Sequence, residues 1–283
     1  LGDLYSQIKF LDLGETFGKS YYGFINKYFT KIMYKPLPRK KSIAAIIEKI
    51  KPFCIRVTNT SLKLPPKIYK IEHIELTDIQ KKLLTQLSEY FQLEYKKVVI
   101  ETEFIFSLIN KSLQICAGFI KDDKGNVEFV KTNKDEMLAE ILDEINVYDK
   151  KVIIWCAYLH TVKKLSILLK TFNPLILTGA SKDVNLIVNK FQHSKNNNIL
   201  IAIQKKGAAS ITLTNCQYAI YYSNSWSYDD RSNSEARIYR KGSEKHKHVT
   251  YIDLISRDTI EEKMLECLKQ KKDLVTELKA IFQ

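Results

Sequence analysis

The sequence lacks several features that would assign a protein to a familiar class. Its five cysteines stand far apart, with no pair at metal-ligand or redox spacing, so neither a zinc module nor a dithiol site is predicted. The expected free, buried thiols are Cys54, Cys116, Cys156, Cys216 and Cys267. No apolar run approaches the roughly 20 residues that cross a bilayer, and the N-terminus has no signal pattern. We therefore expect a cytoplasmic protein with no membrane partner.

Glycine is also scarce, and only residues 14–20 resemble a P-loop. In this stretch three residues separate the glycines, where the P-loop pattern needs four. The preceding residues 5–13 are amphipathic and helical rather than a buried strand. A glycine turn between helices is the prediction. No acidic cluster suited to magnesium is present either, so the chain alone is not expected to hydrolyse a nucleotide and no metal site is predicted.

Arginine is the rarest of the basic residues, with six against thirty-nine lysines, and three of the six lie between residues 231 and 240. A guanidinium makes planar, bidentate contact with phosphate oxygens, which an ammonium cannot. Arg237 and Arg240 stand three residues apart, a spacing that would place both on one face of a helix. The pair is therefore predicted to hold a polyphosphate.

The net charge of +13 favours a polyanionic partner such as nucleic acid, because excess lysine attracts phosphate whatever the base sequence. Biased genomic composition is the other explanation, since the chain is also rich in isoleucine and asparagine. Charge alone does not decide between a polyanionic partner and biased composition.

The N-terminal half is predicted to be mostly helical. Short aromatic helices fill residues 1–34, a loop with two prolines covers 35–41, and a helix covers 42–50. A short strand is expected at 53–57. Two further helices are expected at 77–95, where Thr77 and Gln80 have capping-box spacing, and at 103–117. Residues 122–126 form a turn.

Strands and helices alternate in the second half of the sequence. The expected strands are 152–157, 174–178, 199–203, 218–223 and 249–255, and the expected helices are 134–145, 160–171, 183–192, 228–239 and 258–280. The strands are almost wholly apolar, as strands covered on both faces are. This pattern predicts an α/β fold, a parallel sheet with helices on both faces, with functional loops beyond the carboxyl ends of its strands.

Two loops after predicted strands carry candidate site residues. Residues 204–210 combine small residues with Lys205 and Lys206, which suits a backbone approach to phosphate, although a plain strand-to-helix turn is an equal reading. Trp226 follows the strand at 218–223, where an aromatic ring is usually part of the core. Asp229 and Asp230 are expected to cap the helix that follows.

Read in order, five segments of the second half resemble a known series of motifs. They are residues 151–156, 177–179 with 191–192, 207–213 (helicase motif V), 224–228 (a Trp-Asn-Pro element that keeps Trp226) and 234–242 (motif VI, with Arg237 and Arg240). The chain thus resembles the second half of a Swi/Snf-type DNA translocase of helicase superfamily two, of the phage or mobile-element type. Residues 3–12, 17–18, 53–57, 64–67 and 76–80 follow the same family order.

The resemblance implies a domain plan and a RecA-like fold. Residues 1–70 would be the end of a first RecA-like lobe, 71–145 a helical connecting region, 146–257 the second RecA-like lobe and 258–283 a C-terminal helix. The ATP-binding motifs would belong to the part of the first lobe that lies outside this sequence. A bacterial or phage-infected cytoplasm is the implied location.

The resemblance also implies roles for individual residues. Arg237 and Arg240 would be catalytic arginine fingers towards ATP. Gly207 and Ser210 would join the two arginines in binding ATP, whose Mg²⁺ would be held mainly by the absent part of the first lobe. Lys205, Lys206, Thr212 and Trp226 would contact the backbone of DNA, expected to be a duplex, without reading its sequence.

Four positions depart from the family pattern. In motif VI, Asn233 or Ser234 stands where the family usually has the opening glutamine, Tyr239 replaces a histidine, and Ser243 replaces a glutamine. In motif V, Ser210 replaces a glycine. We interpret the chain as the C-terminal half of an ATP-dependent DNA translocase that is inactive alone. The alternative is a non-catalytic nucleic-acid- or protein-binding module that has kept the fold.

Overall fold

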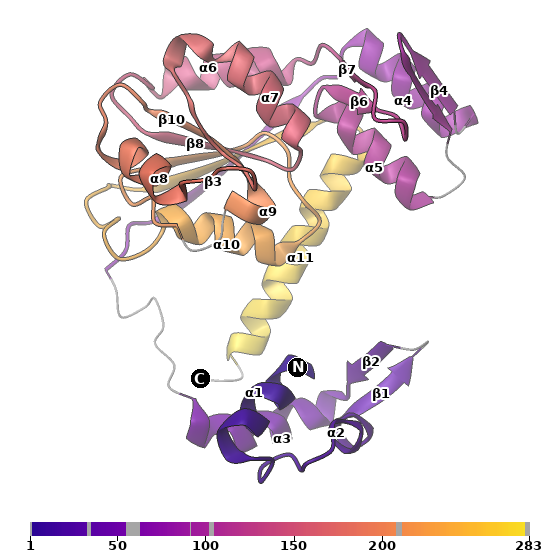
Figure 1. Cartoon of the computed structure of the whole chain (residues 1–283), viewed down its shortest axis with the longest axis vertical. Helices are drawn as coiled ribbons and strands as arrows, with labels where there is room; N and C mark the ends of the chain where they lie inside the picture. The colour runs from indigo at the N-terminus through magenta and orange to yellow at the C-terminus, as the bar shows by residue number, and fades with distance from the viewer. Residues whose placement is uncertain are drawn as a thin grey trace. The chain divides into compact units, whose positions relative to one another are not determined.

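The computed structural model describes residues 2–32, 35–54, 63–90, 92–101, 105–207 and 211–280. The chain divides into two compact units (Figure 1). The first comprises Leu1–Ser61 with Leu278–Gln283, and the second Leu62–Glu277.

The first unit is mainly helical, as expected, but it also contains a hairpin. Its elements are α1 (Gly2–Asp12), α2 (Tyr21–Tyr28), β1 (Phe29–Ile32), β2 (Lys35–Pro38), α3 (Lys40–Ile50) and the 3₁₀ helix η1 (Lys51–Phe53). β1 and β2 pair antiparallel where a loop was expected at 35–41. Both strands of a two-stranded ribbon are edge strands, and edge strands tolerate proline. Pro36 and Pro38 therefore do not prevent pairing. Of the strand expected at 53–57, Phe53 is in η1, and residues 55–57 lie outside the described residues.

The second unit is built on a six-stranded, wholly parallel sheet in the order β3-β12-β11-β8-β10-β9. The strands are β3 (Lys67–Ile74), β8 (Val152–Cys156), β9 (Leu175–Leu177), β10 (Ile199–Ile203), β11 (Tyr218–Tyr221) and β12 (Val249–Ser256). The predicted α/β fold class is confirmed. β3 was not predicted; it pairs with β12 along its whole length and begins before the boundary expected at residue 70.

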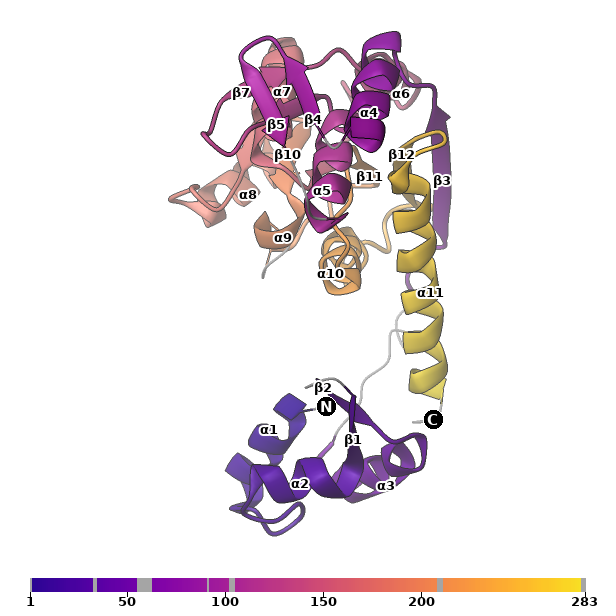
Figure 2. The same cartoon turned by 90° about the vertical axis from the view of Figure 1, so that its right-hand side faces the viewer.

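Helices cover both faces of the sheet (Figure 2). On one face α6 (Lys134–Glu144) and α7 (Leu159–Leu168) pack on Ile154, Ile201 and Ile220. On the other, α8 (Val184–His193) and α10 (Tyr228–Ile238) pack on Trp155 and Tyr221. Because successive strand residues face opposite ways, each apolar strand supplies both cores.

The expected helical connection also contains two hairpins. α4 (Asp78–Tyr90) is followed by β4 (Gln92–Tyr95) and β5 (Val98–Glu101), and α5 (Ile105–Cys116) by β6 (Phe119–Lys121) and β7 (Val127–Phe129). The helix expected to reach Tyr95 therefore ends at Tyr90. The capping box is confirmed, since the Thr77 backbone N–H donates to Gln80 Oε1 at 3.2 Å and the Gln80 N–H donates to Thr77 Oγ1 at 3.3 Å.

A buried ion pair fixes the first turn of α11 (Ile260–Ala280) to α6. Lys134 Nζ lies 2.7 Å from both carboxylate oxygens of Glu261 and donates to the Tyr222 carbonyl at 3.2 Å. Glu261 Oε2 also accepts the Ser256 N–H at 2.9 Å. Both charged side chains are almost wholly buried.

The cysteines are free, and three of the five are buried as expected; Cys267 is partly buried and Cys54 is exposed. No helix within the described ranges is long and apolar enough to cross a membrane.

Candidate phosphate and nucleic-acid site

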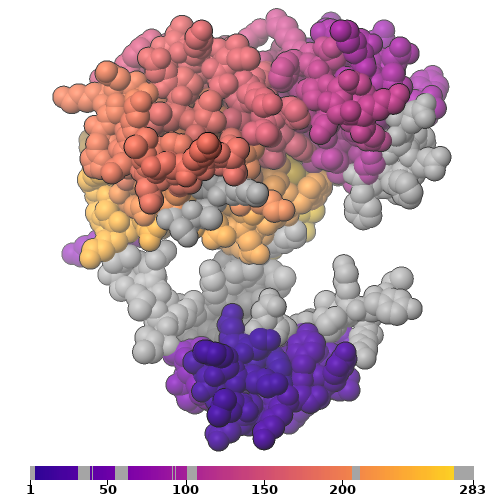
Figure 3. Space-filling view, in the orientation of Figure 1, coloured from indigo at the N-terminus to yellow at the C-terminus, as the bar shows by residue number. Residues whose placement is uncertain are grey.

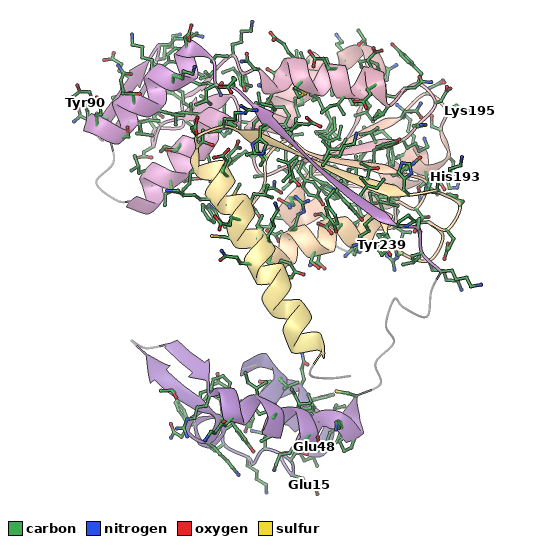
Figure 4. The ribbon with its side chains drawn as sticks, turned by 180° about the vertical axis from the view of Figure 1, so that it is seen from behind. Glu15, Glu48, Tyr90, His193, Lys195 and Tyr239 are labelled. Atoms are coloured by element: carbon green, nitrogen blue, oxygen red, sulfur yellow. The ribbon has the colours of Figure 1, made fainter. Side chains whose placement is uncertain are left out.

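Arg237 and Arg240 converge on one short segment, although they do not share a helix face. α10 ends at Ile238, so Arg240 stands beyond the helix, after Tyr239, which is labelled in Figure 4. Arg237 Nη1 donates to the Ile211 carbonyl at 3.3 Å, and Arg240 Nη1 donates to Thr212 Oγ1 at 3.1 Å. The structure therefore brings the predicted residues Arg237, Arg240 and Thr212 together.

No carboxylate is paired with either guanidinium within the described residues. Arg237 is half-buried, Arg240 is exposed, and their bonds go to carbonyl and hydroxyl oxygens. Burial lowers the pKa of Arg237, and the neighbouring charge of Arg240 lowers it further. Two uncompensated positive charges with free N–H donors form a site that an anion would stabilise.

The segment that the arginines contact is held from both sides. The Leu213 N–H donates to the Arg237 carbonyl at 2.9 Å, which ties the segment to α10. From α8, Gln192 Nε2 donates to the Thr212 carbonyl at 3.1 Å. Gln192 Oε1 accepts the Asn215 N–H at 3.0 Å, and Asn215 Nδ2 donates to the Gln192 carbonyl at 2.7 Å. Sequence reasoning noted Gln192 only as part of a motif and missed this supporting role.

The third arginine of the cluster, Arg231, is buried in an ionic network. Its guanidinium makes a bidentate pair with Asp253 of β12, donates to Glu235 Oε1 at 2.8 Å and lies 3.5 Å from the Tyr221 ring centroid. Asn224 bonds to both Arg231 and Asp253. Burial opposes the charged form, but Asp253 and its neighbours raise the pKa of Arg231 well above its ordinary value. The network fixes α10, and hence Arg237, on β11 and β12.

The remaining candidates follow the carboxyl ends of β10 and β11. The helical turn α9 (Gln204–Gly207) contains the exposed Lys205 and the backbone of Gly207. Buried Gln204 joins the two loops, because its Oε1 accepts the Ser225 N–H at 3.0 Å. The Nε2 of Gln204 is buried and has no hydrogen-bond partner among the described residues. The Lys206 side chain and Ser210 lie outside the described residues.

Trp226 is 37% exposed and is not a core residue. It precedes Ser227, the N-cap of α10, whose Oγ accepts the Asp230 N–H at 3.1 Å. Asp229 and Asp230 lie in the first turn, as expected. α8 contributes to the surface that faces the viewer in Figure 3. The candidates thus form two groups: Arg237 and Arg240 with Thr212, and Lys205 and Gly207 with Trp226.

Comparisons with known proteins show what this chain is similar to. Residues 133–242 match the model of the helicase conserved C-terminal domain. An uncharacterized ATP-dependent helicase, MG018, from Mycoplasma genitalium is 28% identical over 242 residues, which cover 83% of this chain and 23% of the relative. The putative ATP-dependent helicase/translocase YwqA of Bacillus subtilis is 26% identical over 83% of this chain and 27% of its own length. The chain thus spans about a quarter of these relatives.

Solved structures show the same fold. The C-terminal part of the Fun30 ATPase domain superposes with a TM-score of 0.57 at 21% identity, over 72% of this chain and 90% of that one. The Sulfolobus solfataricus SWI2/SNF2 ATPase core domain superposes with a TM-score of 0.54 at 23% identity. The match covers 98% of this chain and 57% of that one. The sheet and its helices are therefore a RecA-like helicase lobe, and the chain is similar to the C-terminal portion of Swi/Snf-type helicases.

Proposed function

We propose that this chain is the C-terminal half of an ATP-dependent DNA translocase and that Arg237 and Arg240 are its arginine fingers. The convergence of two guanidiniums on residues 211–213, without carboxylate partners among the described residues, carries this proposal. Fixed positive groups stabilise the charge that develops on a transferred phosphoryl group. Gly207 and Ser210 would help to bind ATP beside them.

The nucleotide is held mainly by a first lobe. No group of three or more metal-ligating side chains occurs in the part of the chain that the structure describes. These residues do not fit a Mg²⁺ site, so we assign the ion to that lobe and derive no step through it. The first unit supports such a partner because large apolar side chains are exposed within residues 10–22, including Phe10 at 85% and Leu13 at 80%.

DNA is the proposed track, contacted through its backbone. Lys205, Lys206, Thr212 and Trp226 are the proposed contacts. A solved SWI2/SNF2 ATPase core in complex with dsDNA, similar in fold with a TM-score of 0.52, supports a duplex. Phosphate contacts of this kind position a duplex without specifying bases.

The test is turnover in a full-length protein that contains this chain. Arg237→Ala or Arg240→Ala should reduce DNA-stimulated ATP hydrolysis by a factor on the order of 10³ and leave DNA affinity nearly unchanged. Arg257→Ala is the matched control, since this arginine is exposed and paired with Glu75 at 3.4 Å. Unaltered turnover in both finger variants would remove the assignment.

The second candidate is a non-catalytic binding module. The changed neighbours Tyr239 and Ser243 favour it, because Ser243 is buried and donates to the Arg240 carbonyl at 2.8 Å, a structural rather than a catalytic contact. A full-length wild-type protein that binds DNA but shows no DNA-stimulated hydrolysis would select this alternative.

A further inference from the structure

A separate pocket lies at the amino edge of the sheet. It has a volume of about 270 Å³, and the residues that line it immediately precede or begin three neighbouring strands, β8, β10 and β9. The residues that line the pocket include Tyr148, Phe172, Asn173, Lys195 and Asn196. Five residues of β8, at roughly 3.3 Å each, separate this edge from the carboxyl edge that carries Lys205 and Trp226.

Two aromatic rings, one of them exposed, form one wall of the pocket. The Tyr148 and Phe172 rings lie 5.6 Å apart at 44°. Phe172 packs against the core, whereas Tyr148 is 72% exposed. Asn198 Nδ2 donates to the Tyr148 carbonyl at 2.6 Å and fixes the backbone beneath the ring. An exposed ring on a fixed backbone is a surface on which a nucleobase can stack.

Polar groups beside the rings remain available for a ligand. The exposed side chains of Asn173 and Asn196 have no hydrogen-bond partner among the described residues. Each amide offers donors and an acceptor that match a base edge. Exposed Lys195 has no ion-pair partner in the same described part of the chain. The adjacent carboxylate of Asp149 accepts a bond from Asn146 at 2.8 Å.

A basic loop continues from this pocket along the same edge. Lys245 and Lys247 are exposed in the loop before β12. Lys245 Nζ donates to the side chain of Asn215, which in turn donates to the Gln192 carbonyl at 2.7 Å. Gln192 stands three residues before Lys195, which lies at the rim of this unit in Figure 4. Two hydrogen bonds therefore connect the basic loop to the end of α8.

We propose that this edge binds a single-stranded nucleic acid, with one unpaired base stacked on Tyr148 and the adjoining phosphates along Lys195 and the basic loop. An aromatic platform beside a basic track is the arrangement that holds single strands. The open pocket favours a strand over a free nucleotide, because a strand also gains the contacts along Lys245 and Lys247. The proposal does not depend on the arginine fingers or on the duplex contacts.

The test uses this chain and a fluorescent oligothymidine, with binding followed by anisotropy. Tyr148→Ala should weaken single-strand binding by about tenfold, and Tyr148→Phe should retain it, because phenylalanine still stacks. Tyr90→Ala is the matched control, since Tyr90 is 67% exposed at the end of α4. Lys195→Ala should reduce the slope of log affinity against log salt by about 0.7.

Three outcomes would overturn the proposal. Equal effects of Tyr148→Ala and Tyr90→Ala would show that Tyr148 is not a platform. An equal loss of duplex binding would show that the site does not select single strands. Competition by thymidine monophosphate as strong as that of the oligonucleotide, at equal nucleotide concentration, would indicate a mononucleotide site. Unchanged duplex binding and turnover in Tyr148→Ala would leave the arginine-finger proposal standing, so the two failures are distinguishable.

Discussion

Arg231 and Arg237 lie on the same helix, six residues apart, and the structure uses them in opposite ways. Arg231 is buried against Asp253 and Glu235, and its charge is neutralised inside the protein. Arg237 is half-buried and donates, within the described residues, to the carbonyl oxygens of Asn233 and Ile211. The difference shows that a guanidinium is structural where carboxylates surround it and is available to an anion where its acceptors are neutral.

The largest expected effect is loss of stability on replacing Arg231. Arg231→Ala would leave Asp253 buried without its counter-charge, and removing one partner of a buried pair costs roughly 3–5 kcal/mol. Arg237→Ala, which removes no ion pair seen in the described part of the chain, should change the free energy of unfolding by less than about 1 kcal/mol. Urea denaturation of this chain measures both. Equal losses in the two variants would contradict the contrast between the arginines.

A smaller effect should follow from Thr212→Val, which removes the hydroxyl that Arg240 contacts while preserving the shape of the side chain. A hydrogen bond of this kind contributes about 1 kcal/mol, so we expect turnover of a full-length protein to fall by about fivefold. Thr212→Ser keeps the hydroxyl and should retain most of the activity. If Thr212→Val and Thr212→Ser behave alike, the hydroxyl does not orient Arg240.

The smallest effect concerns His246, whose Nε2 lies 2.8 Å from the Thr214 carbonyl, next to the segment that the arginines contact. Burial lowers the pKa of His246 below the ordinary 6.5. The hydrogen bond to Thr214 raises this pKa in part, whereas the charges of Lys245 and His248 lower it further. The unfolded chain thus binds this proton more readily than the folded one. Stability contributed by neutral His246 is present above pH 6.5 and is lost as the pH falls from there through the lower folded pKa.

Melting temperatures across this pH window measure the effect. His246→Gln should flatten the decline of the melting temperature below pH 6.5. An unchanged slope would assign the acid sensitivity to other groups.

The sheet was largely predictable because its central strands are continuous apolar runs that only a doubly covered position explains. β3 was not, because Lys67–Ile74 mixes charged and apolar residues, and its strand conformation depends on pairing with β12, far away in sequence. β4 was read as the continuation of the helix that begins at 77, since its glutamine and glutamate suit either state.

The site was predictable where composition singled out residues and not where it depends on tertiary partners. Scarcity of arginine identified Arg237 and Arg240. The spacing suggested that both arginines share one helix face, but α10 ends between them. Arg237 contacts the segment of residues 211–212 from the helix, and Arg240 contacts it from the loop that follows the helix. The role of Arg231 needed Asp253, 22 residues away, and that of Gln192 needed Thr212 and Asn215. Sequence spacing within one element does not reveal such pairings.

The buried pair between Lys134 and Glu261 has a mechanical consequence. Peeling the first turn of α11 from α6 would leave an ammonium in an apolar interior without its counter-ion, which costs several kcal/mol. Swinging that turn away as a hinged lever therefore costs the same free energy. A force on the turn is transmitted to α6 through Lys134, and from Lys134 to the Tyr222 carbonyl that follows β11.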